Sequence, residues 1–427
     1  MRPVTEDELP AFVNAVEAAF GYVPPDEEAD LWRRGTDPSR TLAVFDAGEI
    51  VGTAGAWAME MTLPGLVSVP VAGVTAVGVQ PTHRRQGLLT RMMERQLDDC
   101  LSWNEPIAIL TASEAVIYGR FGYGWATSLV AAEVSTDHGA FAVPVDVGGR
   151  MRRINKEAAG KIAPPLYERA RRRTSGDATM VPIFWEFMTL DLEHRRDGAS
   201  ALFFAVHESA AGEPDGFVSY RYKEKWQNGN PASTVIVTEL FGDSPGVEAA
   251  LFRYLLDLDL VAQVKFHNRP VGDHLQRRLA NPRRYSVTGV GDHVWVRLVD
   301  VAAALPLRRY TTDGSVVLQV HDRFRPANEG TYLLEGGPDG AICARISGSG
   351  SGASGASASG APASAGAGSG APDVELPVDS LGAAFLGGVS FTSLAEAGRA
   401  VERKPGGLRR ADAMFLTDTP PYCRTGF

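Results

Sequence analysis

The residues best suited to chemistry lie in one short stretch, where the apolar run VTAVGV (74–79) meets the basic loop PTHRRQG. A helical pattern begins directly after Gly87. The first amides of a helix have no backbone partners, and the helix dipole favours negative charge there. Glycine leaves room for a phosphate, while Arg84 and Arg85 add donors and positive charge. The spacing predicts a diphosphate-binding loop, neither a Walker loop nor a GxGxxG loop; an ordinary basic helix start is the alternative.

This stretch resembles the acetyl-CoA signature R/Q-x-x-G-x-G/A of the GCN5-related N-acetyltransferases, although Leu89 stands where glycine or alanine is usual. The resemblance implies an acetyl-CoA site in which the pantetheine arm pairs with the preceding strand and the pyrophosphate binds the loop amides. It also implies that the next strand splays away, so that the residues after it flank the cofactor arm. The implied contacts are Val77, Gly78, Val79, Arg84, Arg85, Gln86, Gly87, Leu88, Leu89, Thr90, Ser113 and Glu114.

A tyrosine in IYGRFGYGW (117–125) is the second candidate group. Acetyl transfer from a thioester to an amine releases a thiolate, which leaves faster when a positioned acid protonates it. Tyr118 and Tyr123 both have the required hydroxyl. The family's general acid lies in the short helix before the FGY turn, so the resemblance favours Tyr118. A purely structural Tyr118, with its hydroxyl satisfied in the core, is the alternative.

The elements that must position these residues occur twice along the chain. A hairpin, a central strand, a long helix and a further strand are expected within 41–111, and the same order recurs within 202–267. In the second copy FGDSPG joins the strand to the helix and carries no arginine. The pattern predicts an α/β (α+β) fold built from an internal duplication. A third region begins near Val299, with a small antiparallel sheet.

With these features the whole chain resembles the Eis (enhanced intracellular survival) family, through PTHRRQGLL, SEAVIYGRFGYG and the terminal Phe427. The resemblance implies tandem acetyltransferase folds followed by a sterol-carrier-like domain. The expected domains are 1–140, which binds acetyl-CoA, 141–298, which is degenerate, and 299–427, which ends in a catalytic C-terminus. The resemblance also implies a homohexamer that acetylates primary amines of polyamine-like molecules, aminoglycosides or lysine side chains.

The C-terminal carboxylate is the family's general base, and Phe427 is the matching position here. An amine substrate is mostly protonated at neutral pH and must lose a proton before it attacks. An α-carboxylate, with an ordinary pKa of ~3.3–3.7, is ionised and can accept that proton once partial burial raises its pKa. The alternative is a loose chain end on the surface.

The substrate is less well defined by the sequence. A polycation pocket should show carboxylates between Phe20 and Trp32, and Asp26 is the acid we expect there. Acidic residues also favour exposed helix starts, which is the alternative for Asp26. Trp32 is expected to stack against the substrate, or else to pack in the core. The position before the terminal residue, Gly426, supplies no acid.

Composition narrows the class of protein. A length of 427 residues predicts two or three domains, and the net charge of −9 argues against a general nucleic-acid binder. The start MRPVTEDELP is unlike a secretory signal, and no apolar run is long enough for a membrane span. An odd number of cysteines and scattered histidines predict a cytoplasmic protein without a metal site. The run of Gly, Ser, Ala and Pro at 347–372 is expected to be a flexible insert.

A protein of a different class is the rival hypothesis. In it the sterol-carrier-like domain holds an apolar ligand and the acetyltransferase fold is vestigial. The intact loop at Arg84 to Gly87 argues against this carrier, because a vestigial site has no need of a phosphate-binding loop.

Overall fold

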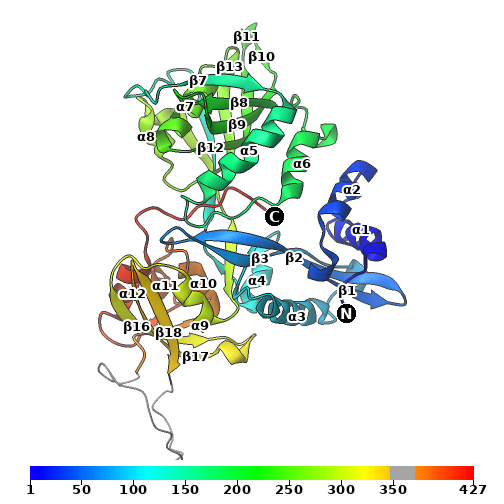
Figure 1. Ribbon diagram of the computed structural model, residues 1–427, viewed down its shortest axis with the longest axis vertical. Coiled ribbons are helices and arrows are strands. Elements are labelled where there is room, and N and C mark those ends of the chain that lie inside the picture. The colour runs from blue at the N-terminus through cyan, green and yellow to red at the C-terminus, as the bar shows by residue number, and fades with distance from the viewer. Residues whose placement is uncertain (347–370) are drawn as a thin grey trace, which may run out of the picture.

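The computed structural model describes residues 1–346 and 371–427. Figure 1 shows two α/β units, blue to cyan and green, one above the other, with a third unit in yellow to red packed beside the first. Each unit has a sheet flanked by helices, which confirms the predicted α/β (α+β) class. Nearly all of the predicted insert at 347–372 lies outside the described residues.

The first sheet is assembled mainly from apolar runs in the first third of the chain. Its strand order is β1 (Thr41–Asp46), β2 (Glu49–Leu63), β3 (Val67–Val79), β4 (Ile107–Thr111), β15 (Val294–Leu298) and β5 (Gly124–Trp125). β1 to β3 are antiparallel, whereas β3 and β4 are parallel. The helices of this unit are α1 (Leu9–Ala19), α2 (Asp26–Gly35), α3 (Leu88–Ser102) and α4 (Ala115–Tyr118).

The helix that follows the basic loop is held by an apolar face. α3 buries Met92, Met93, Leu97 and Cys100, whose spacing places them on one side of the helix. On the same side, Gln96 donates from Nε2 to the carbonyl of Gly55 on β2 at 2.7 Å. These contacts fix the direction of α3, and so they fix where its first-turn amides point.

The second sheet repeats the arrangement, as the internal duplication predicts. Its strand order is β14 (Tyr285–Asp292), β6 (Ser128–Ser135), β13 (Val261–Arg269), β12 (Ser233–Gly242), β9 (Pro214–Lys223), β8 (Phe203–Glu208) and β7 (Arg150–Ile154). A small hairpin, β10 (Trp226–Gln227) with β11 (Asn230–Pro231), extends from it. The helices are α5 (Lys156–Arg171), α6 (Pro182–Leu190), α7 (Pro245–Leu256) and α8 (His274–Arg278).

Two strands are exchanged between the first and the second sheet, relative to their order in the sequence. β6 follows β5 directly, yet it lies between β14 and β13 in the second sheet. β15 follows β14, yet it pairs with β4 and β5 in the first sheet. The predicted boundaries after residues 140 and 298 therefore follow the order of the sequence but not the membership of the sheets, and the domain division stays a prediction.

Among the described residues the third unit has a five-stranded sheet. Its strand order is β18 (Gly340–Ile346), β17 (Gly330–Gly337), β16 (Gly314–His321), β19 (Val374–Pro377) and β20 (Val401–Glu402). β16 to β18 are the antiparallel strands that the sequence predicts, and β19 joins them in parallel to β16. Its helices are α9 (Val301–Ala304), α10 (Val378–Ala384), α11 (Phe391–Glu396) and α12 (Gly407–Phe415).

An arginine occupies the interior of this third unit. Arg308 is fully buried, and its Nη2 donates to the carbonyl of Phe415 at 2.7 Å while Nη1 donates to the carbonyl of Phe385. The guanidinium also lies over the rings of Tyr310 and Phe415, at 4.7 and 4.9 Å from their centroids. Burial lowers the pKa of Arg308 to about 10. The centre of the sterol-carrier-like unit therefore holds a bonded cation.

After α12 the chain leaves the third unit and runs back toward the other two. Figure 1 shows this tail, in red, passing between the first and second units before it ends near β3. No helix among the described residues is long and apolar enough to cross a membrane.

Candidate active site

The site begins where two parallel strands of the first sheet separate. In the described chain β3 and β4 pair at Ala72 with Ala108 and at Gly73 with Ile109, and not beyond. A bulge at Ala76, with φ of 54°, re-aims the remainder of β3. The main chain of the last three residues of β3 therefore lines a cavity instead of pairing with β4.

The cavity beside this main chain measures about 620 Å³ and continues over the basic loop. The predicted cofactor contacts that line it are Val77, Gly78, Val79, Arg84, Arg85, Gly87, Leu88, Leu89, Thr90, Ser113 and Glu114. Gln86, the remaining predicted contact, is exposed on the loop and does not line this cavity in the described chain. We call this space the cofactor cavity, after the cofactor that the resemblance predicts for it.

The loop has the geometry of an anion cradle. Arg85 and Gly87 both adopt positive φ, 64° and 76°, which turns successive amides toward the start of α3. A Cβ added at Gly87 would meet no atom within 4 Å, so the space above this glycine is open. Among the described residues neither Arg84 nor Arg85 forms an ion pair, whereas His83 Nε2 lies 3.1 Å from Asp46 Oδ2 and fixes the loop. The free cations and open amides fit a diphosphate.

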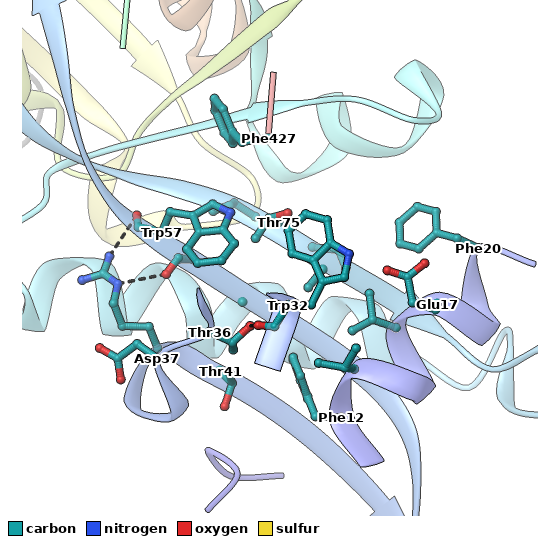
Figure 2. A pocket seen from close by; sticks show the side chains of 18 of the residues that line it. Phe12, Glu17, Phe20, Trp32, Thr36, Asp37, Thr41, Trp57, Thr75 and Phe427 are labelled. Atoms are coloured by element: carbon teal, nitrogen blue, oxygen red, sulfur yellow. Dashed lines mark hydrogen bonds between the residues drawn. The ribbon is translucent and has the colours of Figure 1, made fainter. Parts of the chain in front are cut away.

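A second cavity, of about 310 Å³, lies on the other side of Tyr118. Residues from α1, α2, β2 and β3 line it, together with the last residue of the chain, and Figure 2 shows it from close by. Both cavities share the lining residues Phe20, Val77, Ser113 and Tyr118. The two spaces are therefore adjacent, and we call the second one the amine cavity, after the substrate that the resemblance predicts.

Tyr118 and Tyr123 are in different environments. Tyr118 ends α4, is 8% exposed and lines both cavities, whereas Tyr123 is fully buried and its hydroxyl has no hydrogen-bond partner in the described chain. The two rings meet edge to face at 6.0 Å. Burial, and then the charge of Glu114, raise the pKa of Tyr118, so its hydroxyl stays protonated at neutral pH. Of the two tyrosines, Tyr118 is the one that reaches both cavities.

The second unit holds the C-terminal tail by a series of hydrogen bonds. Asn268, at the end of β13, donates from Nδ2 to the carbonyls of Cys423 and Arg424, each at 3.1 Å. The amide of Arg424 donates to Asp177 Oδ1 at 2.9 Å, and its guanidinium pairs with the same carboxylate. His293 Nε2 donates to the carbonyl of Thr425 at 3.0 Å.

This clamp brings the end of the chain into the amine cavity. Phe427 lines the cavity, and Thr111 Oγ1, at the end of β4, donates to a carboxyl oxygen of Phe427 at 2.7 Å. Figure 2 shows Phe427 on a different side of the cavity from Phe12 and Glu17 of α1. The splayed strand that ends at Thr111 thus holds the terminal carboxyl near the junction of the two cavities.

The two predicted substrate residues are placed differently. Trp32 lines the amine cavity, and Phe184 and Phe187 of α6 pack on its indole, with ring centroids 6.0 and 4.6 Å away. Asp26 is exposed at the first position of α2 and lines neither cavity of the described chain. This placement follows from the direction of α2, whose buried side is further along the helix, at Glu28, Ala29 and Leu31.

Several lining residues were not predicted from the sequence. Glu17 and Asp37 supply acids to the amine cavity, Trp57 supplies a second indole, and Thr111 binds the terminal carboxyl. For Glu17 a signal was present: the apolar positions of α1 surround it at helical spacing, so that this acid interrupts an apolar face. For the others no local pattern marks the residue.

Comparison with known proteins finds matches to three family models along the chain. Models of an acetyltransferase (GNAT) domain match residues 1–126 and 182–298, and a sterol carrier protein domain matches 301–424. An uncharacterised N-acetyltransferase of Streptomyces avermitilis is 39% identical, with 100% of this chain and 99% of the relative covered. The N-acetyltransferase Eis of Mycobacterium tuberculosis is 30% identical over 97% of this chain and 96% of its own.

A solved structure extends the agreement to three dimensions. Eis1 from Mycobacterium abscessus superposes with a TM-score of 0.83 at 32% identity, covering 100% of this chain and 99% of that one. The anion cradle, the splayed strands and the sequence identity along the whole chain all indicate the same family. The chain is an acetyltransferase of the GCN5-related type, and it belongs to the Eis family of N-acetyltransferases.

Proposed function

We propose that this protein transfers the acetyl group of acetyl-CoA to a primary amine of a small polyamine-like molecule, by direct transfer between the two cavities. The observation that carries the proposal is their junction: Tyr118 lines both, and the terminal carboxyl of Phe427 reaches the amine side. Aminoglycosides and lysine side chains are further candidate substrates, which rest on the family resemblance alone.

The cofactor cavity has the donors that acetyl-CoA requires. GCN5-related acetyltransferases use acetyl-CoA, which supplies the acetyl group as a thioester. Arg84, Arg85 and the first amides of α3 would hold its diphosphate, and the main chain from Val77 to Val79 would pair with the pantetheine arm. The opening between β3 and β4 then directs that arm toward Tyr118.

The amine cavity supplies the base. The carboxylate of Phe427 accepts a proton from the substrate ammonium, directly or through a water molecule, and leaves a free amine that can attack. Thr111 holds one carboxyl oxygen at 2.7 Å and so orients the group. In the described part of the chain no cation lies within ion-pair distance of this carboxyl, which leaves it available for the substrate's charge.

Tyr118 supplies the acid. Its hydroxyl donates a proton at the sulfur as the carbon–sulfur bond breaks, so the product thiol leaves neutral. Its raised pKa keeps the hydroxyl protonated until that moment. The substrate nitrogen starts as an ammonium and ends as an amide, so it loses two protons over the cycle: one to Phe427 before it attacks, and one to water as the tetrahedral adduct collapses. The sulfur gains one proton from Tyr118. Exchange with water then removes the proton from Phe427 and returns one to Tyr118, so that one proton is released for each acetyl group transferred.

The carrier hypothesis has less support. An apolar ligand would need an open interior in the third unit, where Arg308 and its aromatic neighbours lie. Instead, the contribution of this unit to the site is the tail that ends in Phe427. Assembly as a homohexamer and a cytoplasmic location stay predictions from the resemblance and from composition.

Thiol release from acetyl-CoA tests the proposal. We expect turnover with at least one class in a panel of polyamines, aminoglycosides and lysine peptides, with the acetyl group on a nitrogen of the product. Mass spectrometry of the product distinguishes transfer from hydrolysis. Absence of turnover with every amine, combined with tight binding of an apolar ligand, would instead support the carrier.

A substitution at Gly87 tests the cradle separately. Aspartate tolerates a positive φ, but its carboxylate would occupy the open space above the loop and repel a diphosphate. We expect Gly87→Asp to raise the KM for acetyl-CoA by roughly tenfold or more, since it adds a negative charge where the helix start favours the negative charge of the ligand. Gly398→Asp is the matched control, because Gly398 has φ of 72° and similar open space in the third unit. An unchanged KM in Gly87→Asp would contradict the assigned cradle.

A further inference from the structure

The face of α1 that lines the amine cavity is apolar except at one position. Phe12, Val13 and Val16 line the cavity together with Phe20, which directly follows the helix, and Glu17 lies among them. In the described chain the carboxylate of Glu17 has no hydrogen-bond partner and no ion pair. A carboxylate that faces an aromatic cavity without a counter-charge is costly, which makes this position unusual.

The other charged side chains that line the cavity already have partners. Asp37 Oδ1 accepts hydrogen bonds from the amide and hydroxyl of Ser39, at 2.9 and 2.7 Å. Arg40 lines the same space, but its Nη2 pairs with Glu105 at 2.6 Å and its Nε donates to the carbonyl of Ala56. Glu17 therefore adds a negative charge that no described side chain in the cavity balances.

Aromatic rings lie beside this carboxylate. In Figure 2 the carboxylate of Glu17 points toward the indole of Trp32, and Trp57 lies beyond that indole. The Nε1 of Trp32 is buried and has no hydrogen-bond partner in the described chain. Indole faces attract ammonium groups, and an adjacent carboxylate strengthens the attraction when water is displaced. A cation placed here would meet both kinds of group.

Burial, followed by the nearby charge of Glu28, raises the pKa of Glu17, while the charge of Arg195, which is paired with Glu28, opposes the rise. Glu28 itself is paired with Arg195, His194 and Tyr22, so it is not free to bind a ligand. A ligand cation at Glu17 would supply the counter-charge that the cavity lacks and would favour the ionised carboxylate.

We infer that Glu17 binds the second, remote ammonium of a diamine substrate while the first amine lies between Phe427 and Tyr118. The inference rests on the proposed function and makes it more specific: the favoured substrate is an extended aliphatic diamine rather than a monoamine. Glu17 and Phe427 line one cavity from different elements, so a substrate that spans it reaches both carboxylates.

The test compares cadaverine with pentylamine, which has the same carbon chain but one amine. For wild type we expect a lower KM for cadaverine. In Glu17→Gln we expect the KM for cadaverine to rise by roughly tenfold to a hundredfold, because one partner of a desolvated charge pair is lost. The KM for pentylamine and that for acetyl-CoA should stay near wild type. Glu27→Gln, an equal change of charge at an exposed residue outside the cavity, is the control.

Binding measured without turnover separates this inference from the proposed function. Quenching of tryptophan fluorescence, or calorimetry, gives the Kd of cadaverine for wild type and Glu17→Gln. Weaker binding to the variant supports the subsite even if no acetyl transfer occurs, in which case only the proposed function fails. Equal Kd and KM values for the two proteins overturn the subsite, while turnover of pentylamine would leave the proposed function standing.

The folded state gives a further check on the variant. Removal of an unpaired, partly buried carboxylate leaves no charged partner behind, so Glu17→Gln should unfold at a temperature equal to or above that of wild type. A loss of cadaverine binding with an unchanged or raised Tm therefore assigns the effect to the carboxylate. A lowered Tm would show that Glu17 stabilises the fold, and would count against its role as a free ligand-binding group.

Discussion

Deletion of Phe427 should lower kcat by about a hundredfold or more and leave the KM for acetyl-CoA close to that of wild type. The deletion moves the terminal carboxylate back by one residue, roughly 3.5 Å along the chain. It would then no longer meet the hydroxyl of Thr111 or reach the same point in the amine cavity. The cofactor cavity does not include Phe427, so acetyl-CoA binding should persist.

The matched control is Phe427→Ala, which removes the ring and keeps the carboxylate. If the carboxylate is the base, this variant should retain far more activity than the deletion. Neither change removes Asn268, Asp177 or His293, which hold the tail upstream, so the Tm should stay near that of wild type. A difference in kcat between the two variants therefore reports on the position of the carboxylate, not on folding.

The pH dependence of the turnover rate should change if the Phe427 carboxylate is the base, and should not change if its role is only structural. Without a base the reaction must use the small fraction of amine that is already deprotonated. The rate of the deletion variant should then rise by about tenfold per pH unit below the amine pKa, more steeply than that of wild type. Turnover of the deletion variant within threefold of Phe427→Ala, with the same pH profile, would show that another group takes the proton.

The part of the site that could be predicted is the part made by neighbours in sequence. Arg84, Arg85 and Gly87 lie within four residues of one another, directly before α3, so the turn and the first helical amides alone bring them together. The direction of α3 depends on how the helix packs, but apolar residues at helical spacing already predict which of its faces is buried. This is why the loop, the strand before it and the short helix with Tyr118 were placed from residue patterns and resemblance.

The amine cavity could not be predicted in the same way. Its walls come from α1, α2, β2, β3 and the end of the chain, so its charge depends on contacts between distant segments. Asp26 and Glu17 are both acids near the predicted substrate region, and only the orientation of each helix decides which of them faces the cavity. Helix spacing identifies the faces of a helix, whereas tertiary packing decides which cavity each face meets.

The exchange of β6 and β15 between the two sheets is a second feature that local sequence patterns could not predict. The burial of β6 alternates along the strand and β15 is largely buried, but neither pattern specifies which of the two sheets receives the strand. The exchange has a consequence for the site: His293, between β14 and β15, meets the tail at Thr425. The chain's return to the first sheet thus helps to guide the C-terminus to the amine cavity.

Replacement of Tyr118 by phenylalanine should lower kcat by about a hundredfold, because the ring that lines both cavities stays while the acidic proton is lost. The KM for acetyl-CoA should change little. Tyr123→Phe is the matched control: the hydroxyl of Tyr123 is buried without a partner, so its removal should leave kcat unchanged and the fold at least as stable. Equal losses in the two variants would point to packing of the paired rings as the cause.

The acid has a second signature in the choice of acetyl donor. A donor whose thiol has a lower pKa needs less help from a proton donor, so the loss caused by Tyr118→Phe should shrink with an activated thioester. Because burial and Glu114 raise the pKa of Tyr118 above its ordinary value, wild-type kcat should show no alkaline decline from this group between pH 7 and 9. A constant loss across donors would contradict the assignment, since it would place the effect of the hydroxyl before the carbon–sulfur bond breaks.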